Sequence, residues 1–169
     1  MKFSKFSYLL AWFVTFLPVC AESVRFPPAD WQPEPSPQAS EWAEPGGRMR
    51  IFASQYPKSF NYYLDTNVFS GKLFGLQFES LIGRNGLTLE PEPGIAASVE
   101  VSEDKMTFTF TLDERATWSD GVPITAEDVA WTWNAIMDHT HLTGPHKVGL
   151  SRFEPPVILD ERTVQFTAK

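Results

Sequence analysis

The sequence is poor in cysteine, because Cys20 is the single one and it lies near the N-terminus. A chain with one cysteine can form neither an internal disulfide framework nor a thiolate metal site. Basic residues are outnumbered too, with 14 Lys and Arg against 21 Asp and Glu and a net charge of −7. No basic cluster offsets this balance, so we expect no nucleic-acid partner.

The sequence also lacks the common signatures of catalysis. It contains no Gly-x-Ser-x-Gly motif and no glycine-rich phosphate loop. Asp120 is followed by Gly121, a pair that first indicates a turn. Glu79 is expected to be solvated or salt-bridged rather than an acid catalyst. We therefore expect a protein that is not an enzyme and needs no cofactor.

Residues 1–21 have the pattern of a secretory signal peptide. Lys2 and Lys5 precede an apolar run over 6–17, which is too short for a spanning helix. Small residues at 19–21 predict cleavage before Glu22, and hence export. Lipid attachment at Cys20 is the alternative, and Val19 disfavours it because lipoprotein processing normally requires a smaller residue there.

Residues 22–47 are predicted to be a linker. Six prolines and a Gly46-Gly47 pair lie in this segment, which can form neither a helix nor a central strand. Trp31 and Trp42 are unusual in a spacer. They either dock on the surface of the following domain or bind a partner.

The clearest pattern runs from Met106 to Ile136. Apolar residues alternate with threonines over 106–112, which predicts a half-buried strand. A turn over 118–123 follows, and Thr125 then begins a helix in which Asp128 can complete a capping box. The predicted apolar face of this helix consists of Ala126, Val129, Ala130, Trp133, Ile136 and Met137.

Two hairpins are predicted to form one small sheet that packs against this helix. The first hairpin, over 98–112, pairs 99–101 with 106–112, and the second, over 153–167, pairs 153–159 with 163–167. The expected inward side chains are Val99, Val101, Phe108, Phe110, Val157, Leu159, Val164 and Phe166. A strand over 48–54 and a helix over 71–82, ended by a turn at 83–86, are predicted before them.

The order of these motifs resembles a known family. A strand ending at Leu112 is followed by Trp118-Ser119-Asp120-Gly121 and then by Ile124-Thr125-Ala126-Glu127-Asp128-Val129. This string is similar to that of the family 5 extracellular solute-binding proteins, the periplasmic receptors of ABC importers for oligopeptides, dipeptides and nickel complexes. The family usually has Lys or Arg directly after the strand, whereas this chain has Asp113, and Arg115 is a candidate substitute.

The resemblance implies a mixed α/β fold, namely the N-terminal portion of a type II periplasmic binding protein. Residues 48–169 would supply part of lobe I and a small β-rich subdomain, an incomplete version of the two-lobed fold. The implied function is periplasmic capture of a short peptide or similar small solute by a monomer that delivers it to an inner-membrane ABC permease. The alternatives are a truncated, non-binding chain with a scaffold or interaction role, or a receptor for a nickel chelate or a sugar.

The resemblance also implies where a ligand would bind. The step from strand 48–54 into the next loop would line the ligand cleft, which makes Gln55, Tyr56 and Asn61 the candidate contacts. The alternative is a capped turn in which Tyr56 packs into the core.

All three histidines, His139, His141 and His146, lie in one loop and are weak metal-binding candidates. Their spacing matches no closed metal site, so a polar loop at the end of the helix is the favoured interpretation.

Overall fold

The computed structural model describes residues 23–33, 40, 42, 44, 46–48, 50–52, 55–63 and 67–169. The predicted signal peptide and Cys20 lie outside these residues. In chain order the elements are β1 (Val24–Phe26), α1 (Val68–Gly75), β2 (Ile82–Arg84), β3 (Pro91–Pro93), β4 (Ala96–Val101), β5 (Thr107–Leu112), α2 (Ala126–Met137), α3 (Gly144–Leu150), β6 (Val157–Asp160) and β7 (Thr163–Thr167).

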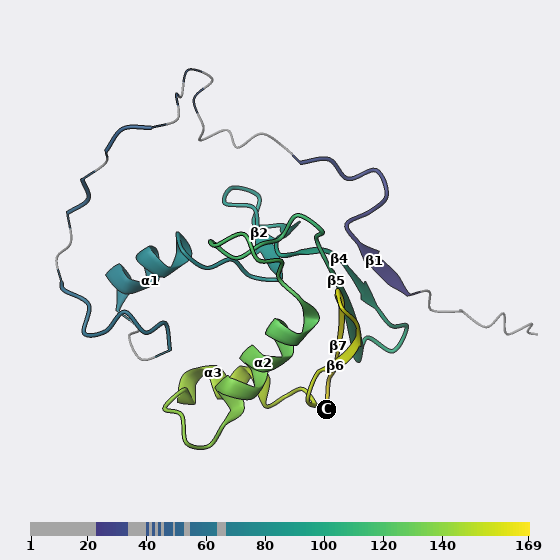
Figure 1. The fold of residues 1–169 in the computed structure, drawn as a ribbon. Helices are drawn as coiled ribbons and strands as arrows, with labels where there is room; N and C mark the ends of the chain where they lie inside the picture. Colours follow the sequence, from purple (N-terminus) through teal and green to yellow (C-terminus); the bar gives the residue numbers. More distant parts are fainter. Residues whose placement is uncertain are drawn as a thin grey trace, which may run out of the picture.

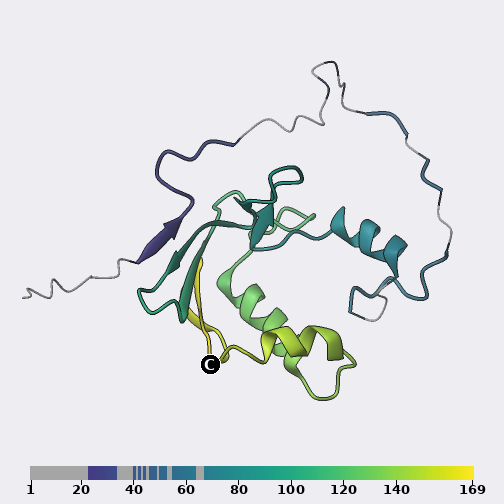
Figure 2. The ribbon, with the colours of Figure 1, turned by 180° about the vertical axis from the view of Figure 1, so that it is seen from behind.

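A five-stranded antiparallel sheet is the centre of the fold. Its strand order is β1-β4-β5-β7-β6, so the prediction that both hairpins join one sheet is confirmed. Helices α2 and α3 lie on one side of this sheet, and α1 stands on the same side but farther out (Figures 1 and 2). Among the described residues, none of the helices combines the length and the apolarity needed to span a membrane.

The sheet has an apolar inner face. Phe110 lies opposite Val99 on one side and Val164 on the other, and Val164 is fully buried. Three phenylalanines extend this face, with ring centroids 5.9 Å apart for Phe110 and Phe166, and 6.3 Å apart for Phe153 and Phe166. Helix α2 packs against the β6–β7 half of the face.

The predicted inward set is wrong for β6. Val157 and Leu159 are 53% and 52% exposed. The register pairs Val157 with Gln165 and Ile158 with Val164, so Ile158 is the side chain on the apolar face. Because side chains alternate along a strand, an error of one residue in parity moves each of them to the opposite face.

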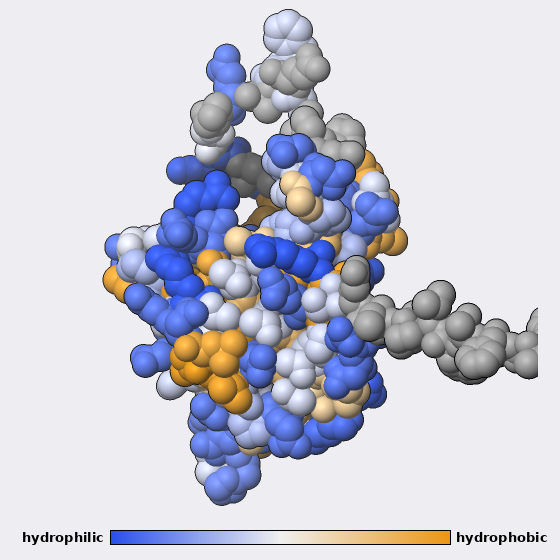
Figure 3. Space-filling model, turned by 90° about the vertical axis from the view of Figure 1, so that its right-hand side faces the viewer, coloured by the Kyte–Doolittle hydropathy of each residue, from blue (hydrophilic) through white to orange (hydrophobic). Residues whose placement is uncertain are grey.

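The outer face of the sheet is polar. Thr107, Thr109 and Thr111 of β5 lie opposite Thr167, Gln165 and Thr163 of β7. The amide of Gln165 donates a hydrogen bond to the hydroxyl of Thr109 at 3.1 Å. Figure 3 shows this side of the molecule as mainly hydrophilic, with an orange hydrophobic patch at the lower left.

Helix α2 begins as the sequence predicts. The Thr125 hydroxyl accepts from the Asp128 amide at 3.4 Å, and the Asp128 carboxylate accepts from the Thr125 amide at 2.9 Å. This reciprocal pair is the predicted capping box. The buried residues of the helix, Ala126, Ala130, Trp133 and Ile136, all belong to the predicted apolar face.

A small core forms where the chain enters the sheet. Ala96, Leu112 and Ile124 are buried together. The amides of Ile95 and Ala96 donate to the carbonyls of Ser80 and Leu81 at 3.0 and 2.9 Å. At Gly94 an added Cβ would lie 2.3 Å from the Ser80 carbonyl oxygen, so this approach of two backbone segments requires glycine.

Two predicted elements before this core differ from the structure. The helix predicted over 71–82 spans Val68–Gly75 instead, because Asn67 caps it and accepts from the Ser70 amide at 2.9 Å. The residues that follow form a β2–β3 hairpin, in which Ile82 pairs with Pro93, where the sequence predicted only a turn and an extended segment.

The strand predicted over 48–54 is absent from its described residues, 48 and 50–52, while 49, 53 and 54 lie outside them. A strand exists only where another strand pairs with it, and the described residues provide no partner here. By contrast, three residues of the predicted linker form β1, which pairs with β4. The prolines at 27 and 28 confine it to the sheet edge.

Candidate functional site

The loop over 55–63 carries the three predicted ligand contacts. Gln55, Tyr56 and Asn61 are exposed, and Tyr56 is 96% exposed. The structure therefore excludes the alternative in which Tyr56 packs into the core. Asn61 has a local role as well, because its side-chain oxygen accepts from the backbone amide of Tyr63 at 2.9 Å and its own backbone amide donates to the Ser59 hydroxyl at 3.0 Å. These bonds fix the turn that ends the loop.

An aromatic cluster attaches this loop to the helices. It consists of Tyr62, Tyr63, Phe74, Phe78 and His146. The Tyr62 ring centroid lies 5.4 Å from that of Phe74 and 5.6 Å from that of His146. Phe74 is 3% exposed. The cluster thus joins the loop, α1 and α3, which are separate in sequence.

Sequence reasoning missed this cluster. The available signals were the adjacent tyrosines at 62 and 63 and the i, i+4 spacing of Phe74 and Phe78, which places both rings on one side of the chain. No nearby sequence pattern indicated that His146 of α3 would contact these tyrosines. Burial raises the pKa of the Tyr63 hydroxyl, and the neighbouring Tyr62 adds to this shift.

The three histidines have three different environments. His139 is 96% exposed and its Nδ1 lies 3.8 Å from the Asp138 carboxylate. The Nδ1 of His141 lies 2.7 Å from the Ala135 carbonyl oxygen, whereas His146 belongs to the aromatic cluster. Within the part of the chain that the structure describes, no group of three or more His, Cys, Asp or Glu side chains is arranged to hold a metal ion.

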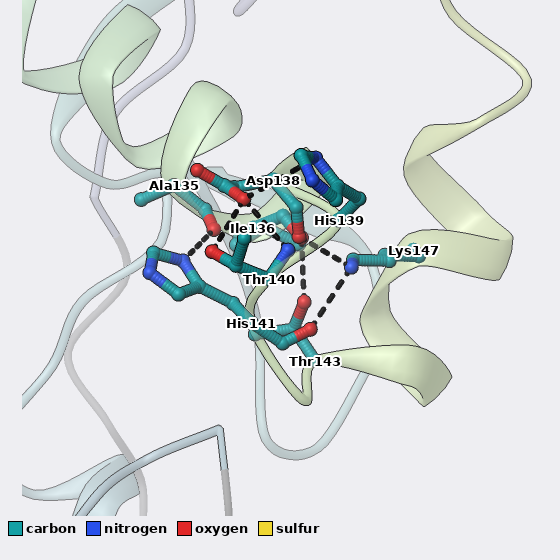
Figure 4. A network of polar contacts seen from close by, with 8 residues as sticks. All are labelled: Ala135, Ile136, Asp138, His139, Thr140, His141, Thr143 and Lys147. Atoms are coloured by element: carbon teal, nitrogen blue, oxygen red, sulfur yellow. Dashed lines mark hydrogen bonds and ion pairs between the residues drawn. The ribbon is translucent and has the colours of Figure 1, made fainter.

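The loop that contains His139 and His141 caps the C-terminal end of α2 (Figure 4). The Thr143 hydroxyl donates to the Ile136 carbonyl at 2.5 Å. The Lys147 ammonium donates to the carbonyls of Asp138 and His141 at 2.5 and 2.9 Å. Carbonyls at a helix end lack partners within the helix, and a cation there is favoured by the helix dipole. This arrangement gives the loop a structural role.

Asp138 completes the network. Its carboxylate accepts from both the hydroxyl and the amide of Thr140 at 2.7 Å. These bonds, with smaller contributions from His141 and His139, hold the pKa of Asp138 below its ordinary value.

The charged residues that could suggest a catalytic or binding role form local contacts or are exposed. The Asp120 carboxylate accepts from the Val122 amide at 3.0 Å and so forms the turn before α2. Glu79 is exposed. Arg115, the candidate substitute for a family cation, is bound by Asp113 through contacts of 2.7 and 3.0 Å. Its guanidinium is therefore paired within the chain.

Comparison with known proteins shows which family the C-terminal half of the chain resembles. Residues 90–169 match the model of the bacterial extracellular solute-binding proteins, family 5. The predicted resemblance is thereby confirmed, and the matched region contains the strand, turn and capped helix that suggested it.

Two curated relatives are peptide-binding proteins by name. The chain is 37% identical over 92 residues to the oligopeptide-binding protein OppA of Bacillus subtilis, and the match covers 53% of this chain and 16% of that protein. It is 39% identical over 61 residues to the periplasmic murein peptide-binding protein MppA of Escherichia coli, covering 36% of this chain and 11% of that protein. The chain thus spans a small part of the length of these relatives.

Solved structures show the fold. A periplasmic oligopeptide-binding protein from Borrelia burgdorferi superposes with a TM-score of 0.60 at 25% identity, over 67% of this chain and 26% of that one. The binding protein AgaA, solved with agropinic acid, superposes with a TM-score of 0.61 at 26% identity, over 67% of this chain and 22% of that one. The predicted mixed α/β fold, part of a type II periplasmic binding protein, is confirmed.

Proposed function

We propose that this chain contributes to the periplasmic substrate-binding component of an ABC importer that captures short peptides or similar small solutes. The observation that carries the proposal is the family match over residues 90–169, together with relatives that are named oligopeptide- and dipeptide-binding proteins. Binding and release, without chemistry, agree with a site that lacks paired catalytic groups among the described residues.

The proposed solute contacts are Gln55, Tyr56 and Asn61. Their loop is exposed at its first residues and held at its last residues by the aromatic cluster. An exposed tyrosine ring supplies contact area at a low cost in side-chain entropy, and an amide side chain both donates to and accepts from a peptide backbone. Bonding to the backbone would permit recognition of many peptide sequences.

One lobe alone is insufficient to bind a solute tightly. Sites for small molecules are concave and bury most of the ligand surface, whereas Tyr56 is 96% exposed. We propose that a second lobe closes over the solute and that the closed form is recognised by an inner-membrane permease. The apolar segment at residues 1–21 supports export to the periplasm, and we propose that the receptor acts there as a monomer.

Calorimetry tests this function. The protein, together with any polypeptide encoded in frame after Lys169, is titrated with a mixture of di- to pentapeptides. We expect saturable heat, and binding at least about tenfold weaker in the Tyr56→Ala variant, since a buried aromatic anchor contributes about 1.4 kcal/mol or more. Phe60→Ala is the matched control, because Phe60 is an exposed aromatic of the same loop but not a proposed contact.

Two results would contradict these proposals. If the peptides produce no heat while a nickel chelate or a sugar does, the substrate class is wrong. If peptides bind but Tyr56→Ala and Phe60→Ala behave alike, the function stands and the proposed contacts are wrong.

A further inference from the structure

The two ends of the 55–63 loop have different surroundings. Gln55 and Tyr56 at its start are exposed, whereas Tyr62 and Tyr63 at its end belong to the aromatic cluster. Figures 1 and 2 show this part of the chain passing between α1 and α3. The position of the proposed solute contacts therefore depends on what the two tyrosines contact.

His146 of α3 contacts both tyrosine rings. Its ring centroid lies 5.6 Å from that of Tyr62, with the ring planes inclined by 34°. It lies 5.2 Å from that of Tyr63, with the planes almost perpendicular at 89°. The Nε2 atom of His146 is buried and has no hydrogen-bond partner in the described part of the chain. The imidazole thus holds the tyrosines by ring packing and not through a hydrogen bond of this nitrogen.

The first turn of α3 fixes His146 to the rest of the fold. The His146 amide donates to the Thr143 carbonyl at 3.0 Å, and the Thr143 hydroxyl donates to the Ile136 carbonyl at the end of α2. Lys147, the next residue, donates to two carbonyls of the α2–α3 connection (Figure 4). Because α2 packs on the central sheet, a continuous series of contacts leads from the sheet to the two tyrosines.

From these contacts we infer that His146 is a positioning residue for solute binding. It is not one of the proposed contacts, and it acts through Tyr62 and Tyr63, which hold the loop that presents Tyr56. This inference rests on the proposed function of the loop. A loop that is already held loses less conformational entropy when a solute binds, so the solute binds more tightly.

Two substitutions of His146 distinguish ring packing from burial of an apolar side chain. His146→Phe keeps an aromatic ring and removes the nitrogen that lacks a partner, which is costly to bury. His146→Leu keeps an apolar side chain but removes the ring. We expect His146→Phe to bind peptides as tightly as the parent, and His146→Leu to bind about threefold to tenfold more weakly, the range that an aromatic pair contributes.

Two measurements are made on the protein together with any polypeptide encoded in frame after Lys169. Calorimetry with di- to pentapeptides gives the affinity. NMR without any solute gives the position of the loop, through the amide signals of residues 55–60. These signals should move in His146→Leu and stay close to those of the parent in His146→Phe. Thermal unfolding verifies that each variant is folded.

His141→Ala is the matched control for lost stability. It removes the 2.7 Å contact between the His141 Nδ1 and the Ala135 carbonyl oxygen, and so weakens the same α2–α3 connection without touching the tyrosines. It should lower the unfolding midpoint but leave the peptide affinity and the loop signals unchanged. If His141→Ala weakens binding as much as His146→Leu, general destabilisation explains the effect and the inference is wrong.

A double-mutant cycle with Tyr62→Leu tests whether His146 acts through the tyrosines. Residues in contact have effects that are not additive, so the loss of affinity in the double variant should be clearly smaller than the product of the two single losses. A loss equal to that product would overturn the inference.

Failure of this inference differs from failure of the proposed function. If the parent binds peptides and His146→Leu binds equally well with unchanged loop signals, the function stands and His146 does not position the loop. If the parent binds no peptide, the proposed function fails, and the loop signals of His146→Leu still decide whether His146 holds the loop.

Discussion

His146 and His139 are close in sequence, but their side chains have opposite environments. The His146 ring contacts two tyrosine rings at 5.6 and 5.2 Å, whereas the His139 side chain is 96% exposed. His146→Ala should therefore lower the free energy of unfolding by about 1 kcal/mol, because aromatic contacts contribute about 0.5–1.5 kcal/mol beyond their buried area. His139→Ala should change it by less than about 0.5 kcal/mol. Urea unfolding of both variants measures this, and equal effects would contradict the assignment of His146 to the cluster.

The pair formed by Asp113 and Arg115 makes stability depend on pH at the acidic end. Hydrogen bonds from the Arg115 side chain and then from its backbone lower the pKa of Asp113 from 3.8 to about 2. A depressed pKa stabilises the fold above pH 3.8, and this contribution is lost as the pH falls from about 4 through about 2. The contribution is small, because the guanidinium is exposed and solvent screens the pair.

Arg115→Gln tests this pH dependence. The variant should raise the pKa of Asp113 towards 3.8, as followed by NMR of its carboxyl carbon. The difference in urea midpoint between parent and variant should shrink as the pH falls from about 4 through about 2. Arg25→Gln, which breaks the exposed pair with Glu100, is the control and should leave the Asp113 titration unchanged. An unaltered pKa in Arg115→Gln would show that Arg115 does not cause the shift.

At the scale of the strand, the observed register distinguishes two valines in neighbouring strands. Val164 of β7 is fully buried, whereas Val157 of β6 is 53% exposed. Val164→Ala should destabilise the protein by about 2 kcal/mol, from two buried methyl groups and the cavity that they leave. Val157→Ala should have an effect below about 0.5 kcal/mol. Thermal unfolding measures both, and a large loss in Val157→Ala would instead support the predicted parity of β6.

The close contact between the backbone segments at Gly94 and Ser80 gives a second prediction at the scale of the strands. Gly94→Ala places a methyl group against the Ser80 carbonyl, 2.3 Å from its oxygen before any relaxation. Because the obstacle is backbone, the segments must separate, and we expect a loss of about 1–3 kcal/mol in the free energy of unfolding. Gly75→Ala is the control, since nothing lies within 4 Å of its added Cβ. Similar unfolding midpoints for the two variants would contradict the close approach.

The elements that could be predicted are those specified by nearby residues. The alternating threonines of β5 and the Thr125–Asp128 capping box depend on contacts within a few residues, and both are present. The parity of β6 and the pairing of β1 depend on partners far away in sequence, so local patterns did not determine them. The start of α1 depends on the local Asn67 cap, which the sequence interpretation missed. In the candidate site, the exposure of Tyr56 was compatible with the prediction, whereas the contact between Tyr62 and His146 required the folded chain.

At the scale of the whole molecule, stability should be unevenly distributed. Strands β4, β5 and β7 are paired on both sides, whereas residues 55–63 are held by local turns and by the aromatic cluster. Hydrogen exchange should therefore be slowest in β4, β5, β7 and α2, and fastest over 55–62, because local openings require little free energy where few backbone bonds are buried. Mass spectrometry of exchanged peptides measures this pattern. Uniform protection would show that the loop and the sheet open together.

Strand β1 has a consequence for the order in which the chain assembles. Its Arg25 pairs with Glu100, 75 residues away, whereas the β4–β5 hairpin closes over the short turn at 102–105. Closing the longer loop costs about 2–3 kcal/mol more chain entropy, and three paired residues at an exposed edge offset little of it. The hairpins should therefore form first and β1 should join last, as the strand that completes the sheet and the first to leave it.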